Sequence, residues 1–187
     1  KISLSCRSPP AEIAPGRVVT GSFFIQNHTS LPVTLDSKID LPEGWTLIPM
    51  SSTSFTLDPE GQSLQLVTVK APQRCPAGKY LLNYQVYDSS SILKTTSFYI
   101  VVKPSIDIKS FIRETPKQLF AGDTYDIFLE LVNTGNVTSS IKITTDDCYG
   151  YCCEIFPSSI ITLDCNEKTT VVVHVQTDAS LETHFKH

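Results

Sequence analysis

Apolar and polar residues alternate along most of this chain. Between positions 19 and 25, Val19, Phe23 and Ile25 fall on one parity, and the stretch 125–131 repeats the pattern with acidic residues at two intervening positions. A period of two is typical of a strand with one buried face. Both stretches are therefore predicted to be half-buried antiparallel strands.

The same pattern predicts a series of further short strands. They lie at 33–39, 45–49, 64–69, 80–86 and 97–102, and then at 139–145, 153–156 and 170–175. Turn residues separate them, as in Ala-Pro-Gly16 and Pro-Ala-Gly78. No stretch has sustained helical periodicity, so the chain is predicted to be all-β, with Ig-like antiparallel β-sandwiches.

The pattern also repeats once along the chain. Asn27 is followed by Asn133 and Thr-Leu-Asp58 by Thr-Leu-Asp164, each 106 positions later. A period of this length matches a whole domain. We therefore expect two tandem sandwiches, at 1–103 and 104–187.

The second sandwich is expected to lack its last strands. Tyr80 maps onto residue 186, so the counterparts of the last two strands would lie past His187. Three explanations stay open: excision from a longer protein, a disordered tail, or a strand supplied from outside.

Composition narrows the classes of partner. The net charge of −4 is spread along the 187 residues without a basic stripe, which argues against nucleic acid as a partner. The longest apolar runs, such as Phe-Tyr-Ile-Val-Val102, have about five residues, whereas a membrane helix needs about 20. We expect no membrane insertion.

The cysteine count points to an oxidising compartment. Each predicted domain holds an even number; the six are Cys6, Cys75, Cys148, Cys152, Cys153 and Cys165. Disulfides within each domain are expected, hence a periplasmic, cell-surface or secreted location. Cys6 is expected to pair with Cys75, while pairing among the other four is undetermined.

A zinc site and free thiols are the alternatives for these four cysteines. The adjacency of Cys152 and Cys153 disfavours a zinc site, since all-thiolate sites usually use a Cys-x-x-Cys pair. No metal or other cofactor is predicted.

The stretch 146–153 is where the second copy departs most from the first. Asp146, Asp147, Tyr149 and Tyr151 are predicted to form an interaction loop, because tyrosine supplies contact area at low entropic cost. Calcium at the two aspartates is the alternative, although calcium needs more oxygen ligands.

Three landmarks of the first copy resemble a known family. Leu-Pro-Glu-Gly-Trp45, Leu-Asp-Pro-Glu-Gly61 and Ala-Pro-Gln-Arg-Cys-Pro-Ala-Gly-Lys-Tyr80 resemble the Ig-like alpha-galactosidase-associated (NPCBM-associated) module of bacterial exported proteins. The second copy keeps Asn133-Thr-Gly but has Tyr151 and Cys165 in place of the tryptophan and the turn proline. The resemblance implies a non-catalytic spacer, adhesive or accessory role.

No constellation of residues indicates catalysis. The histidines, His28, His174, His184 and His187, do not stand in a recognisable nucleophile setting. Trp45, Tyr80 and Tyr84 suggest either a sugar-stacking platform or, more ordinarily, the sandwich core. Asn27-His-Thr and Asn136-Val-Thr match the glycosylation sequon.

The sequence thus predicts a non-enzymatic structural or interaction module of a larger exported protein. It would act as a spacer or as an adhesion or assembly surface. Its expected partners are other domains of the same parent or a surface partner, with strand-mediated self-association open. The alternatives are a carbohydrate-binding accessory module and a pilus-like subunit completed by a donated strand.

Overall fold

The protein is all-β in the part of the chain that the structure describes. A computed structural model describes residues 1–49, 53–89, 91–115, 120–145 and 151–179. The chain divides into two compact units, Lys1–Pro104 and Ser105–His187, one residue away from the predicted boundary. Within the described ranges no helix has the length and hydrophobicity to cross a membrane.

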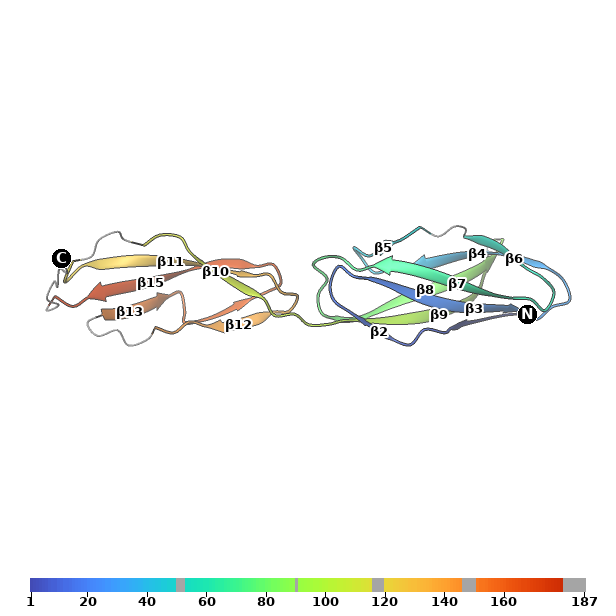
Figure 1. Cartoon of the computed structure of the whole chain (residues 1–187), viewed down its shortest axis with the longest axis horizontal. Coiled ribbons are helices and arrows are strands. Elements are labelled where there is room, and N and C mark those ends of the chain that lie inside the picture. The colour runs from blue at the N-terminus through green and yellow to red at the C-terminus, as the bar shows by residue number, and fades with distance from the viewer. Residues whose placement is uncertain (50–52, 90, 116–119, 146–150, 180–187) are drawn as a thin grey trace, which may run out of the picture. The chain divides into compact units, whose positions relative to one another are not determined.

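Unit 1 consists of two sheets, with strand orders β1-β3-β7-β5 and β2-β9-β8-β4-β6 (Figure 1). The strands of the first sheet are β1 (Ile2–Cys6), β3 (Val18–Asn27), β5 (Thr46–Leu47) and β7 (Gln62–Lys70). Those of the second are β2 (Ala11–Ile13), β4 (Val33–Asp40), β6 (Ser54–Leu57), β8 (Gly78–Asp88) and β9 (Ser91–Val102). All pairs are antiparallel except β2 with β9, which is parallel.

Unit 2 repeats part of this plan. Its four-stranded sheet has the order β10-β11-β15-β13, and β12 pairs with β14 in a second sheet (Figure 1). The strands are β10 (Ile108–Ile112), β11 (Thr124–Asn133), β12 (Ser139–Lys142), β13 (Tyr151–Phe156), β14 (Ile160–Leu163) and β15 (Lys168–Thr177). They correspond to β1, β3, β4, β5, β6 and β7, and the described residues of unit 2 contain no counterpart of β8 or β9.

The predicted alternation places the core of unit 1 between its sheets. Phe23 of β3 stacks on Tyr84 of β8, with ring centroids 4.3 Å apart, and meets the edge of Phe98 of β9 at 6.5 Å. All three rings are buried. Such aromatic packing adds to the free energy gained by burying apolar area.

The core of unit 2 is smaller and aliphatic. Leu131, Ile161, Leu163 and Val171 form a buried cluster, against which Leu129 and other half-buried side chains pack. Because fewer strands cover the four-stranded sheet here, less of its inner face is buried than in unit 1.

A buried asparagine holds the same turn in both units, at the end of β3 in unit 1 and at the end of β11 in unit 2. Asn27 is fully buried, and its Nδ2 donates to Leu31 O at 2.8 Å and Asp58 O at 3.0 Å. Asn133 is also buried, and its Nδ2 donates to Val137 O, the equivalent of Leu31 O, at 2.8 Å and to Leu163 O, one residue before the equivalent of Asp58, at 3.1 Å. A buried amide ties two loops to a strand end in each copy, which explains its recurrence.

The backbone repeats as closely as the side chains. Gly16 and Gly122, 106 positions apart, have φ of 73° and 84° in the turns before β3 and β11. Glu60 and Asn166 are likewise equivalent, with φ of 56° and 64°. These left-handed conformations turn the chain tightly, so both copies reach the following strand in the same register.

One predicted strand ends earlier than expected. The stretch 139–145 was expected to be extended throughout, but β12 ends at Lys142. The remaining predicted strands are present, with ends shifted by a few residues, whereas β1, β2, β6, β10 and β14 had not been predicted.

Candidate interaction surface

Three phenylalanines lie on the outer face of the four-stranded sheet of unit 2. Phe111 of β10, Phe128 of β11 and Phe156 of β13 are 52%, 36% and 54% exposed. Phe128 and Phe156 both lie opposite Val172 of β15, so the three side chains form one row across the sheet. We call Phe111, Phe128, Val172 and Phe156 the aromatic patch.

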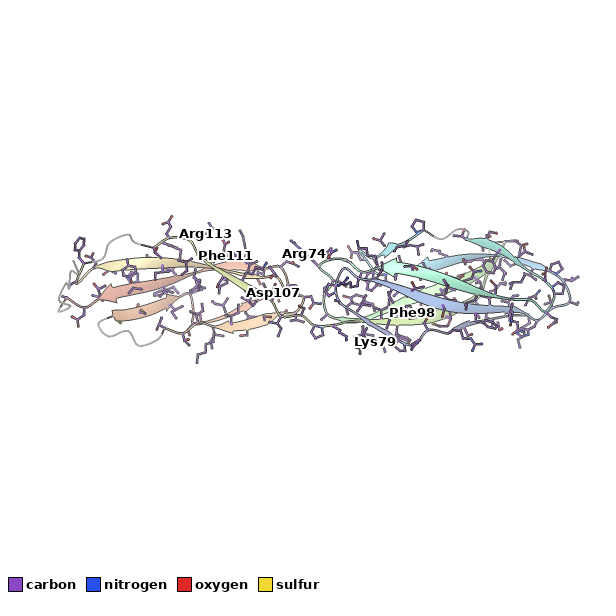
Figure 2. The ribbon with its side chains drawn as sticks, viewed as in Figure 1. Arg74, Lys79, Phe98, Asp107, Phe111 and Arg113 are labelled. Carbon is purple, nitrogen blue, oxygen red and sulfur yellow. The ribbon has the colours of Figure 1, made fainter. Side chains whose placement is uncertain are left out.

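Phe111 extends this row diagonally. It lies opposite Glu130, two residues from Phe128 on the same face of β11. Phe111 on β10 and Arg113, the residue that follows β10, are labelled in Figure 2. Diagonal neighbours on one sheet face are within reach of aromatic side chains, so the patch is contiguous.

Charged side chains of both signs border the aromatic patch. On one side Glu130 accepts hydrogen bonds from Arg113 and lies 4.0 Å from Lys168 Nζ. On the other side Asp126 is paired with His174, which lies opposite Glu154. The rim therefore has little net charge, and these exposed pairs contribute little to stability.

Two apolar residues at outward positions of the strand pattern are the signal of this patch in the sequence. Phe128 stands between Ile127 and Leu129, and Val172 between Val171 and Val173, so both positions expected to be polar are apolar. In an antiparallel sheet with one solvated face, an apolar residue at an outward position needs a separate explanation.

The outer face of unit 1 is also apolar, but its character is aliphatic. Leu64 and Leu66 of β7 are exposed, and Leu64 lies opposite Phe24 of β3. The guanidinium of Arg7 lies over the Phe24 ring, 4.7 Å from its centroid. A cation stacked on the ring covers part of its apolar surface, so this face presents less aromatic area than unit 2.

The predicted interaction loop falls mainly outside the described residues. This applies to Asp146, Asp147, Cys148 and Tyr149, and the structure gives no side-chain environment for Tyr151. Tyr151 is the first residue of β13 and pairs with Thr177. The loop and its calcium alternative therefore stay predictions.

No disulfide bond joins any two of the described cysteines. Cys6 packs against the core cluster that contains Cys75, and its thiol donates to Ser8 O at 3.6 Å. In unit 2, Cys152 is exposed on β13, while Cys153 and Cys165 are half-buried. The predicted disulfides stay predictions.

The aromatic residues considered as a sugar platform belong to the interior of unit 1. Trp45 and Tyr84 are buried, and Trp45 packs on the half-buried Tyr80 at 5.2 Å between ring centroids. Burial raises the pKa of the Tyr84 hydroxyl, because the apolar surroundings disfavour the charged phenolate. Their burial supports the interpretation that these aromatic side chains form part of the sandwich core.

The described histidines are engaged in local contacts. His28 Nε2 lies 2.9 Å from Ser3 Oγ, and His174 is paired with Asp126. His184 and His187 fall outside the described residues. No group of three or more histidine, cysteine, aspartate or glutamate side chains that could hold a metal occurs among the residues described.

A depression of about 360 Å³ lies at one end of unit 1. Its lining includes Ile2, Val33 and Leu93, with Lys1, Lys94 and Asp88 at its border. It is open to solvent and combines apolar side chains with scattered charges.

Comparison with known proteins finds distant matches among solved structures. No family model matches the chain, and no curated protein matches it. Among solved structures, the Clostridium perfringens family 123 glycoside hydrolase is 14% identical with a TM-score of 0.43, over 55% of this chain and 27% of the hydrolase. The E. coli alpha-2-macroglobulin is 16% identical with a TM-score of 0.47, over 66% of this chain and 8% of that protein.

The YadV chaperone matches over a longer stretch. It is 11% identical with a TM-score of 0.32, over 92% of this chain and 84% of the chaperone. The class of this chain, two units built of largely antiparallel β-sheets, follows from its own strands. Proteins of many functions share such β-sandwiches.

Proposed function

We propose that this chain is a non-catalytic interaction module of a larger exported protein, with the aromatic patch of unit 2 as its contact surface. The observation that carries the proposal is the exposure of Phe111, Phe128 and Phe156 on one sheet face. Aromatic residues are enriched in protein interfaces, and contiguous exposed apolar patches mark interaction sites.

The rim supports a protein as the partner. Arg113 and Lys168 on one side, and Asp126 and Glu154 on the other, place charges of both signs around the apolar centre. A protein surface with an apolar centre and a mixed polar rim is the best match, since a strongly charged polymer would find no complementary field.

The exported location rests on the sequence. An even number of cysteines in each unit is typical of proteins made for an oxidising compartment. The resemblance to alpha-galactosidase-associated modules supports the same location and a role as spacer or accessory domain.

Capture from a cell-envelope extract with matched variants tests the contact surface. The variant Phe111→Ser/Phe156→Ser removes two exposed rings, and Lys109→Ser alters the same face of β10 outside the patch. We expect the native chain and Lys109→Ser to retain one specific protein and the double variant to lose it. Equal retention by all three would refute the assignment.

A second candidate function, carbohydrate binding, shares the observation of an aromatic row. Sugar rings stack on exposed aromatic faces, and affinity electrophoresis in gels containing soluble polysaccharide would detect such binding. Retardation of the native chain that the double variant loses would favour this alternative over a protein partner.

A further inference from the structure

The outward residues of the four-stranded sheet of unit 2 form successive rows that cross its strands. Residues opposite each other in paired strands share a row, and successive rows on one face are two residues apart along each strand. In the first row, Val132 of β11 lies opposite both Lys109 of β10 and Lys168 of β15. In the second row, Phe111 lies opposite Glu130.

The rows change in character from one end of the strands to the other. The third row consists of Phe128, Val172 and Phe156, and the fourth of Asp126, His174 and Glu154. Glu130, the acid of the second row, is paired with Arg113, so positive charge is in excess at that end. The outer face therefore has a basic end, an aromatic centre and an acidic end.

Unit 1 shows that the fold does not require these charges and rings. Its strands β1, β3 and β7 pair in the same register as β10, β11 and β15. The residues 106 positions before Lys109, Phe111, Asp126, Phe128 and Lys168 are Ser3, Ser5, Thr20, Ser22 and Gln62. A sheet of the same register thus forms with uncharged polar residues at these positions, so their character in unit 2 needs an explanation other than folding.

The order of the rows makes this face complementary to itself. If two copies meet face to face about a two-fold axis that crosses the strands between the second and third rows, the first row of each lies over the fourth row of the other. Lys168 of one copy then lies over His174 of the second copy. Asp126 and Glu154 flank that histidine, so the lysine meets two carboxylates. An axis along the strands would instead place lysine over lysine, which electrostatic repulsion disfavours.

We propose that the aromatic patch is the interface of a symmetric homodimer, in which the outer sheet faces of two copies of unit 2 pack with their strands antiparallel. This inference rests on the proposed function, because it names a second copy of this chain as the partner of the same surface. A two-fold interface uses one patch twice and so requires self-complementarity. The rings supply the buried apolar contact, and the charges at the two ends fix the orientation.

Sedimentation of the full chain over a dilution series tests the role of the rings. We expect a dimer that dissociates on dilution. In Phe111→Ser/Phe156→Ser each copy loses two rings from the interface, which should raise the dissociation constant at least about 100-fold. Lys109→Ser removes one rim charge and no ring, and it should remain a dimer because a single exposed charge contributes little.

Reversal of one charge at each end tests the orientation. Lys168→Glu makes both ends acidic, and Glu154→Lys makes both ends basic, so each variant alone should dimerise about tenfold more weakly at low salt. An equimolar mixture of the two variants should recover the native affinity, because every acidic end then meets a basic end. Both side chains are exposed, so neither change removes a buried contact needed for folding.

Three results would overturn the inference. They are a native chain that is monomeric throughout the dilution series, a dimer that the double ring variant does not weaken, and a mixture of the two charge variants that associates no more tightly than either alone. If the native chain is monomeric but captures another protein that the double ring variant loses, the homodimer is refuted and the proposed function is supported. Capture that does not depend on the rings refutes the proposed contact surface itself.

Discussion

The buried asparagines allow the stability of each unit to be perturbed in the same way. In Asn27→Ala, unit 1 loses the two hydrogen bonds that Nδ2 donates and the two that Oδ1 accepts, from Thr29 N at 3.0 Å and Thr29 Oγ1 at 2.8 Å. In Asn133→Ala, unit 2 loses the two donated bonds and one accepted from Gly135 N at 3.0 Å.

The magnitude follows from these bonds. Each hydrogen bond contributes about 1 kcal/mol net, and a partner left buried without one costs somewhat more. Asn27→Ala should therefore lower the free energy of unfolding of unit 1 by about 4 kcal/mol, and Asn133→Ala that of unit 2 by about 3 kcal/mol. With a urea m-value of about 2 kcal/mol/M, these losses shift the midpoints by about 1.5–2 M.

Tryptophan fluorescence separates the two units. Trp45 is the only tryptophan in the chain and is buried in unit 1. The two hydrophobic cores share no residue. Asn27→Ala should therefore lower the urea midpoint that Trp45 fluorescence reports for unit 1. Circular dichroism reports the unfolding of both units, so Asn133→Ala should lower the midpoint of the unit 2 part of that signal and leave the fluorescence midpoint unchanged.

The neighbouring residue Gln26 provides the control. It is half-buried on the outer face of β3, and Gln26→Ala should change the free energy of unfolding by no more than about 0.5 kcal/mol. A shift below about 0.5 M for Asn27→Ala would refute the hydrogen-bond account. An equal fluorescence shift for Asn133→Ala would refute independent unfolding of the two units.

The remaining predictions concern Tyr84, the two sequons and the six cysteines. Tyr84→Phe keeps the stacked ring and removes a buried hydroxyl that lacks a hydrogen-bond partner of good geometry, so urea unfolding should show about 1 kcal/mol more stability. Because the folded state keeps the Tyr84 proton longer than the unfolded state does, stability should fall as pH rises above about 10, and Tyr84→Phe should lessen that fall. Neither sequon should carry a glycan after expression in a glycosylating host, since Asn27 and Asn136 are buried and hydrogen-bonded; a glycosidase-sensitive mass would contradict this. Intact mass without reduction should be lower by about six hydrogens if the proposed exported state forms three disulfides, and full alkylation before reduction would refute that state.

Strand parity predicted most of the fold because burial on one face imposes a period of two. The repeat of 106 residues predicted two domains, and Asn27 and Asn133, which are related by this repeat, hold equivalent turns in the two units. The short strands β6 and β10 escaped prediction because pairing with neighbouring strands, more than their own pattern, defines them. Conversely, residues 143–145 have the pattern of a strand, but no ladder with another described strand includes them.

The aromatic patch was missed for a related physical reason. An apolar residue at an outward position looks in the sequence like part of a buried run, and only the register shows that Phe128, Val172 and Phe156 lie side by side. The cysteines and tyrosines of the stretch 146–153 could be proposed as functional from the sequence, because their chemistry does not depend on the fold. Surface location depends on which strands meet, and the sequence alone does not specify that.

The constant offset of 106 residues between equivalent turns has a consequence for how such chains can change in length. A genetic crossover between the codons of Asn27 and Asn133 that duplicates the segment between them would add one unit, with its strands in register and its turns holding their own left-handed residues. Longer arrays are therefore reachable by single recombination events, without an intermediate that has a broken sheet.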